Sequence, residues 1–224
     1  MGKLGPRAIG RAAIVLLPLV FGATSCSEGN AASTFDTSVQ TTLALCRDER
    51  HVVVFDYFGT LTPSDEDLAH WLGEERVIPP ARPGAAEVAS AYRALGYEVL
   101  YLTTAPSEIL LDDGRPLRDH IGDWLAQNGY PVGDGATVTS WDGNHTPMDW
   151  ISTVLGQVVD GGASVDAAYT DNEDKAFAFK TAAPDQVFTL GAGATTSGST
   201  PIPGDDMVAH AAEVTGLEPV CRAG

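Results

Sequence analysis

Basic residues are scarce in this sequence of 224 residues. It contains 13 Lys and Arg against 30 Asp and Glu, which gives a formal net charge of −17 at pH 7. The stretch between Arg118 and Lys175 has no Lys or Arg at all. A surface of this charge repels the backbone of nucleic acids, so we exclude nucleic acid as a partner. The same composition also suits a well-hydrated soluble surface.

The sequence has no apolar run long enough for a transmembrane helix. The apolar run at 12–23 is short, follows Lys3, Arg7 and Arg11, and lies in a segment without acidic residues. A basic start followed by a short apolar segment is typical of a secretory signal, so we predict a signal peptide over residues 1–25 and an exported protein. Without that segment, 10 basic and 30 acidic residues remain, a net charge of −20.

Cysteine is rare, with three residues in the chain. Small residues lead directly to Cys26 in "ATSCS", which resembles a bacterial lipoprotein box with Ala23 where leucine is more usual. Lipidation of Cys26 would anchor the protein to a membrane on the cell envelope. The alternative is ordinary cleavage a few residues later, near "NAAS", which would give a secreted protein.

Lipidation of Cys26 would leave an even pair, Cys46 and Cys221, near the two ends of the folded region. In an oxidising compartment these two cysteines could form a disulfide, although two independent thiols are equally compatible with the sequence. Residues 26–45 are mostly polar and small, and we interpret them as a flexible tether. The remaining 46–224 has the length of one domain.

Short apolar runs alternate along the chain with longer stretches of helical spacing. The run at 51–56 is continuously apolar up to Asp56, as in a strand buried on both faces, whereas Val88, Tyr92 and Leu95 fall on one helical face. This alternation predicts an α/β fold with a parallel sheet and helices on both faces, since each crossover needs a dozen or more residues. We expect strands at 51–56, 98–104, 136–140, 166–170 and 186–190, helices at 82–97, 115–130, 147–159, 173–182 and around 207–214, and a surface loop at 191–206.

Residues suited to phosphate and metal binding follow three of these strands. Asp56 ends the first strand, Thr103 ends the second, and Asp171 follows the strand at 166–170. Ligands of parallel sheets bind at the carboxyl ends of the strands, and oxygen ligands suit Mg²⁺. Each residue also has a purely structural interpretation, since threonine is common in strands and Asp171 could cap the next helix.

Four segments carry a resemblance to a known family. In order and spacing, they are similar to the haloacid-dehalogenase-like (HAD) superfamily, and specifically to its lipin-type branch. The resemblance covers about residues 51–190 and implies a Rossmann-like three-layer sandwich with a mostly parallel sheet. In active members it implies Mg²⁺-dependent phosphatidate phosphatase chemistry through an aspartyl-phosphate. The segments are "VVVFDYFGTLTPSD" (52–65), "GYEVLYLTTAP" (96–106), "WLAQNGYPVGDG" (124–135) and "AAYTDNEDKAFAF" (167–179).

The resemblance assigns roles to residues that match the family motifs. Asp56 takes the position of the nucleophile, Thr60 that of the motif threonine, and Thr103 that of the phosphate-binding threonine. Asp171 takes the position of a metal ligand. The backbone carbonyl of Phe58 would be a further ligand, beside the Asp56 carboxylate.

The chain departs from the family at Phe58. Active phosphatases have a second aspartate at this position, which protonates the leaving oxygen, and phenylalanine cannot do so. Loss of a general acid typically slows a reaction by a factor of about 100 to 10,000. The dehalogenase branch has a tyrosine there and displaces halide, which needs no proton, but the downstream motifs of this chain resemble the lipin-type branch.

The lysine and the second acid of the last motif are also altered. The family places a lysine near the nucleophile, a role for which Lys175 or, less well, Lys180 is available. The second acid usually follows the first by four residues, where this chain has Lys175, while Asp174 comes one residue early. Asp174 is therefore our candidate for a further metal ligand. Ala105 stands where lipin-type sequences often have arginine.

The segment at 63–82 is proline-rich and too short for a substantial folded cap. An open site suits a phosphorylated small molecule, a lipid head group or a protein phosphate. Trp71 and Leu72 could border the site with an apolar lip, although a tryptophan in such a loop more often packs on the core.

Three functions remain open from the sequence. The first is a slow Mg²⁺-dependent phosphohydrolase of the lipin type. The second is a degenerate lipin-like domain that binds a phosphate or phospholipid ligand without turnover. The third is an exported α/β domain whose strand-end residues only cap and turn.

Overall fold

The computed structural model of the chain describes residues 50–64, 66–73, 77–182, 186–191 and 197–220. The predicted signal peptide, the predicted tether, and Cys26, Cys46 and Cys221 lie outside the described residues, so their roles stay predictions. Within these ranges, no helix has both the length and the apolar character needed to cross a membrane.

The described chain forms a six-stranded sheet in the order β3-β2-β1-β4-β5-β6, in which every neighbouring pair is parallel. The central strand β1 is apolar on both faces, and Val52, Val53, Val54 and Phe55 are all buried. This sheet confirms the predicted α/β class. The strands are β1 (Arg50–Asp56), β2 (Glu98–Pro106), β3 (Ala136–Trp141), β4 (Ala163–Thr170), β5 (Gln186–Thr189) and β6 (Thr200–Pro201).

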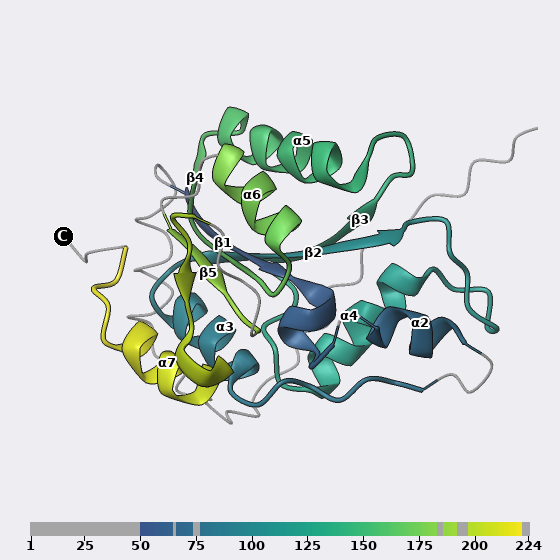
Figure 1. Cartoon of the computed structure of the whole chain (residues 1–224), viewed down its shortest axis with the longest axis horizontal. Helices are drawn as coiled ribbons and strands as arrows, with labels where there is room; N and C mark the ends of the chain where they lie inside the picture. Colours follow the sequence, from purple (N-terminus) through teal and green to yellow (C-terminus); the bar gives the residue numbers. More distant parts are fainter. Residues whose placement is uncertain (1–49, 65, 74–76, 183–185, 192–196, 221–224) are drawn as a thin grey trace, which may run out of the picture. The chain divides into compact units, whose positions relative to one another are not determined.

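Helices cover both faces of the sheet and make three layers (Figure 1). Because side chains alternate along a strand, Val53 and Phe55 of β1 join the apolar core on one face, and Val52 and Val54 join the core on the other. The first core includes residues of α3 (Ala85–Ala94), α4 (Leu117–Gln127) and α7 (Met207–Thr215), and the second includes residues of α5 (Pro147–Asp160) and α6 (Glu173–Thr181).

Helices α3 and α7 pack closely against each other at Gly84, just before α3. Gly84 has φ 83°, and a Cβ atom there would lie 2.3 Å from the backbone nitrogen of Val208. A buried polar network also joins these two helices to β4. The Tyr92 and Tyr169 hydroxyls are 2.9 Å apart, and the Tyr169 hydroxyl is 2.9 Å from Nε2 of His210.

The structure corrects one expectation about a short segment, because the predicted loop at 191–206 contains β6 and a short 3₁₀ turn (Pro203–Asp205). The segment at 63–82 contains a short helix, α2 (Asp67–Leu72), which agrees with the expectation that it forms no substantial cap. Strand β6 has two exposed residues and is held by its backbone pairing with β5, so no apolar pattern indicates it. Trp71 of α2 is buried in the core, which favours the packing interpretation of this residue.

Candidate phosphate and metal site

Asp56, the last residue of β1, is buried in an ion pair at the carboxyl edge of the sheet. Lys175 Nζ donates a hydrogen bond to Asp56 Oδ2 at 2.7 Å, and both side chains are over nine-tenths buried. The Thr170 hydroxyl, at the end of the neighbouring strand β4, donates to the same oxygen at 3.1 Å. Buried charges need such partners because the protein interior solvates them poorly. The site therefore holds a fixed carboxylate next to a fixed cation.

The start of helix α6 places Lys175 in this site. Asn172 caps the helix, and its Oδ1 accepts a hydrogen bond from the Lys175 backbone N–H at 3.1 Å. The Thr170 hydroxyl oxygen in turn accepts from the Asn172 N–H at 3.1 Å. A cation in the first turn of a helix is disfavoured by the helix dipole, so the contact with Asp56 compensates an otherwise poor location.

A wide turn, η2 (Tyr57–Leu61), follows Asp56 and depends on Gly59. Gly59 has φ 77°, and a Cβ atom there would lie 2.0 Å from Asp171 Oδ2. Glycine thus lets the Asp171 carboxylate lie directly against the turn. The Thr60 hydroxyl oxygen accepts a hydrogen bond from the Asp171 N–H at 3.1 Å. The turn after β1 and the loop after β4 are therefore joined at the site.

The side chain of Phe58 is buried among aromatic residues. Its ring centroid lies 4.7 Å from that of Tyr57 and 6.4 Å from that of Trp71, both in edge-on contacts. Burial also raises the pKa of the Tyr57 hydroxyl far above its usual value, so this group stays neutral. The position at which active family members have their second aspartate is thus part of an apolar cluster.

Three other residues that the sequence suggested for the site lie in β2 and α6. Thr103 is buried within β2, three residues before the strand ends, and its hydroxyl oxygen accepts from the Ala105 N–H at 3.1 Å. Asp174 is exposed in the first turn of α6. Lys180 is also exposed and donates to the carbonyl of Ser197. Of the two lysines considered from the sequence, Lys175 is therefore the one that reaches Asp56.

Arg82 is a residue of the site that sequence analysis missed. Its guanidinium donates four hydrogen bonds to backbone carbonyls of the segment that follows Asp56: Nε to Thr60 at 2.9 Å, and Nη2 to Gly59 at 2.5 Å, to Pro63 at 3.1 Å and to Thr62 at 3.3 Å. The only signal in the sequence is a single basic residue between prolines in an acidic chain, which does not indicate these partners.

The oxygen atoms of this site suit a magnesium ion. Asp56, Asp171 and the backbone carbonyl of Phe58 would hold it, since Mg²⁺ prefers carboxylate and carbonyl oxygens. The close approach of Asp171 to Gly59 brings its carboxylate to the turn that contains this carbonyl. Where the chain is described, no three His, Cys, Asp or Glu side chains gather as a metal site.

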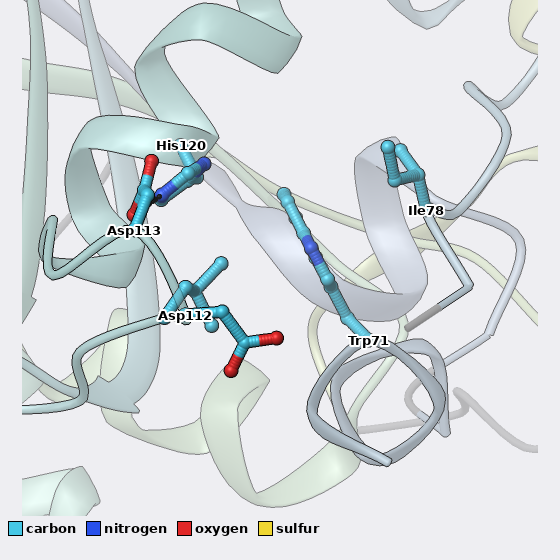
Figure 2. Close-up of a pocket in the computed structure, with 6 residues that line it drawn as sticks. Trp71, Ile78, Asp112, Asp113 and His120 are labelled. Carbon is cyan, nitrogen blue, oxygen red and sulfur yellow. Dashed lines mark hydrogen bonds and ion pairs between the residues drawn. The ribbon is translucent and has the colours of Figure 1, made fainter. Parts of the chain in front are cut away.

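A pocket of about 280 Å³ adjoins the aromatic cluster around Phe58. Figure 2 shows Trp71 between Ile78 on one side and Asp112 and His120 on the other. Leu111 and Asp113 complete the lining, and His120 Nε2 is 3.0 Å from Asp113 Oδ1. Trp71 thus lines the pocket and also contacts Phe58, in the turn that follows Asp56.

Comparison with known proteins gave a family match and similar folds. Residues 53–191 match the model of the LNS2 domain of PITM 1-3. A crystal structure of D,D-heptose 1,7-bisphosphate phosphatase from B. bronchiseptica, complexed with magnesium and phosphate, is 17% identical with TM-score 0.50, over 73% of this chain and 97% of that one. The structure of a protein from Mesorhizobium loti, described as a HAD-like phosphatase, is 12% identical with TM-score 0.51, over 79% and 90%. No curated protein matched.

Proposed function

The chain belongs to the LNS2 domain family, and on that premise we propose that it is a HAD-type phosphohydrolase that cleaves phosphate monoesters slowly with Mg²⁺ as its cofactor. One observation carries the proposal: the buried contact between Lys175 and Asp56 at the carboxyl edge of a parallel sheet. The magnesium and phosphate bound to the similarly folded heptose bisphosphate phosphatase support the cofactor.

Asp56 is the nucleophile in this proposal. One of its carboxylate oxygens attacks the phosphorus atom, the bond between phosphorus and the ester oxygen breaks, and the alcohol leaves with the electron pair of that bond. Water then attacks the aspartyl-phosphate, releases inorganic phosphate and restores the carboxylate. Thr170 fixes the orientation of Asp56 through its 3.1 Å hydrogen bond, and Lys175 offsets the negative charge that nucleophile and phosphate bring together.

Mg²⁺ held by Asp56, Asp171 and the Phe58 carbonyl would supply further positive charge for the phosphate oxygens. The neighbouring Thr60 keeps Asp171 in place, because its hydroxyl oxygen accepts from the Asp171 N–H. Thr103, near the carboxyl end of the neighbouring strand β2, is our proposed hydroxyl contact to the phosphate.

Position 58 offers no acidic side chain that could protonate the leaving oxygen. Phe58 lies in its aromatic cluster, so the departing alkoxide must take its proton from water. We therefore expect the rate to depend steeply on the leaving group. An aryl phosphate whose phenolate is a stable anion should react, whereas an alkyl ester should be slower by a factor of about 100 to 10,000.

The substrate we propose is a phosphate on a large or surface-bound molecule. The loop before α3 contributes only the short helix α2 in its described part, so it forms no large cap. Lipidation of Cys26, which remains a prediction, would bring lipid head groups close, and exported protein phosphates and small phosphate esters have the same reacting group. The pocket beside Trp71 is apolar enough to receive the group that carries the phosphate.

A second candidate function is phosphate or phospholipid binding without turnover. The burial of Phe58 favours it, because the same Asp56 and Lys175 could hold a ligand when no proton donor is present. In that case Mg²⁺-dependent affinity for phosphate would remain, and no phosphate would be released.

The test uses the purified full-length protein with nitrophenyl phosphate and with phosphatidate, each with Mg²⁺ or with a chelator. We expect phosphate release from nitrophenyl phosphate that needs Mg²⁺ and disappears in Asp56→Asn. Release should be at least about 100-fold slower from the alkyl ester. If no substrate gives release that depends on Asp56, the enzyme proposal fails. Isothermal titration with inorganic phosphate then decides on the binding function.

A further inference from the structure

The segment after Asp56 directs five successive backbone carbonyls toward one residue. The Arg82 guanidinium donates hydrogen bonds to the carbonyls of Gly59, Thr60, Thr62 and Pro63. The Arg82 backbone N–H donates to the fifth carbonyl, that of Leu61, at 2.7 Å. All five acceptors are backbone oxygens. These hydrogen bonds therefore depend on the backbone conformation of residues 59–63 and not on their side chains.

We infer that Arg82 is the positioning residue of the Asp56 site, an inference that rests on the proposed function. A loop that binds phosphate must present backbone N–H groups to the anion and keep carbonyl oxygens away from it. A carbonyl that accepts from Arg82 points toward the guanidinium and not toward the phosphate. Arg82 thus fixes the direction of the peptide groups from Gly59 to Pro63.

The support for Arg82 extends into the helical layer. The Arg82 carbonyl accepts from the Ala85 N–H, in the first turn of α3, at 3.2 Å. Gly84 lies against the backbone of α7 at the same place. A second donor also reaches the loop, because the Tyr130 hydroxyl donates to the Leu61 carbonyl at 3.2 Å. The loop after Asp56 is therefore tied to the segment that precedes α3 and to the segment that follows α4.

A lysine could not replace Arg82 in this role. The guanidinium is a planar fork whose separate nitrogens reach carbonyls in different directions, whereas an ammonium is a point charge on a flexible stem. Arg82→Lys thus keeps the charge but loses the geometry. Arg82→Met loses both and keeps much of the apolar stem.

Arg93 provides a matched control. Its guanidinium also donates to two backbone carbonyls, that of Tyr97 at 2.8 Å and that of Asp134 at 2.9 Å. Tyr97 directly precedes β2, and Asp134 lies just before β3. Both carbonyls are thus at the amino ends of these strands, whereas the site is at the carboxyl edge of the sheet. Arg93→Met therefore removes a similar set of hydrogen bonds without touching the loop after Asp56.

The experiment compares wild type, Arg82→Met, Arg82→Lys and Arg93→Met as full-length proteins. Hydrogen exchange is measured on the peptide that covers 57–64, and affinity for inorganic phosphate with Mg²⁺ is measured by titration. We expect Arg82→Met to speed exchange in this peptide at least tenfold and to weaken phosphate binding at least tenfold. Arg82→Lys should have effects of the same sign. Arg93→Met should leave both quantities within twofold of wild type.

The inference is overturned if Arg82→Met lowers the melting temperature as Arg93→Met does but leaves exchange and phosphate affinity unchanged. If Arg82→Met does not fold, Arg82→Lys is judged by the same two measurements. If the wild type binds no inorganic phosphate, the exchange data still decide whether Arg82 holds the loop, and the proposed function is decided separately by phosphate release that depends on Asp56. The two failures are therefore distinguishable.

Discussion

At the scale of single residues, the site depends on a cation held where water scarcely reaches it. Lys175 lies in the first turn of a helix, with its ammonium on the Asp56 carboxylate. Removing one partner of a buried ion pair leaves the other charge without compensation, which typically costs about 3 to 5 kcal/mol. The pair is thus important for folding as well as for the proposed chemistry.

We predict that Lys175→Met lowers the free energy of unfolding by about 3 kcal/mol, because Asp56 then stays buried without its ammonium partner. Denaturant unfolding of the full-length protein measures this change. Lys180→Met is the control on the same helix, since Lys180 is exposed, and it should change stability by less than about 0.5 kcal/mol. Adding Asp56→Asn to Lys175→Met should recover part of the loss. Equal unfolding midpoints for both lysine variants would contradict the prediction.

Phe58→Asp restores the acid of active family members but places it in an aromatic cluster. We predict a gain in the rate on alkyl phosphates relative to nitrophenyl phosphate, together with a loss of stability of about 3 to 5 kcal/mol from the removed ring and the buried carboxyl group. Rates on the two substrates and a melting curve measure both effects. Phe58→Leu keeps an apolar side chain and should leave the ratio of the two rates unchanged. The prediction fails if both variants give the same ratio.

At the scale of elements, the sequence predicts those strands and helices whose positions follow from patterns of apolar residues. The continuous run of β1 and the helical spacing of Val88 and Tyr92 locate the central strand and α3, and the position of Asp56 follows from them. The role of Lys175 depends on where α6 begins, which leaves Lys175 and Lys180 as alternatives in the sequence. Arg82 contacts only backbone atoms, so no pattern of side chains indicates its partners.

Helices α3 and α7 offer a test of close packing between elements. We predict that Gly84→Ala destabilises the protein more than Gly129→Ala does. Both glycines have positive φ, so alanine is strained at either position by about 1 to 2 kcal/mol. A Cβ atom at Gly84 also meets the backbone of α7, whereas one at Gly129 meets nothing within 4 Å. Denaturant unfolding of the two variants measures the difference. Equal losses of stability in the two variants would contradict the prediction, because α7 would then move away from the new methyl group at no energetic cost.

At the scale of the whole molecule, burial of tyrosines sets a limit on alkaline stability. Burial raises the pKa of Tyr92 to about 12, and it raises those of Tyr57, Tyr101, Tyr130 and Tyr169 as well. The unfolded chain ionises its tyrosines near pH 10, so their stabilising effect is complete below that pH. It is lost as the pH rises through the higher values of the folded state.

We therefore predict a steep fall in the free energy of unfolding above about pH 10, of about 1.4 kcal/mol per pH unit for each buried tyrosine. Denaturant unfolding between about pH 9 and 11 measures this slope, and the near-ultraviolet absorbance of tyrosinate follows ionisation. We expect ionisation and unfolding to occur together. Tyrosinate formation near pH 10 in a protein that remains folded would contradict the prediction.

The two-residue strand β6 also affects how the protein behaves in concentrated solution. An unpaired sheet edge is a template on which a second chain can add a strand, and long, flat edges promote aggregation. Strand β6 is short, and Pro201 has no backbone N–H to offer to a neighbour. This border of the sheet therefore gives another molecule almost no backbone to extend, which protects an acidic domain from growing into fibrils on that side.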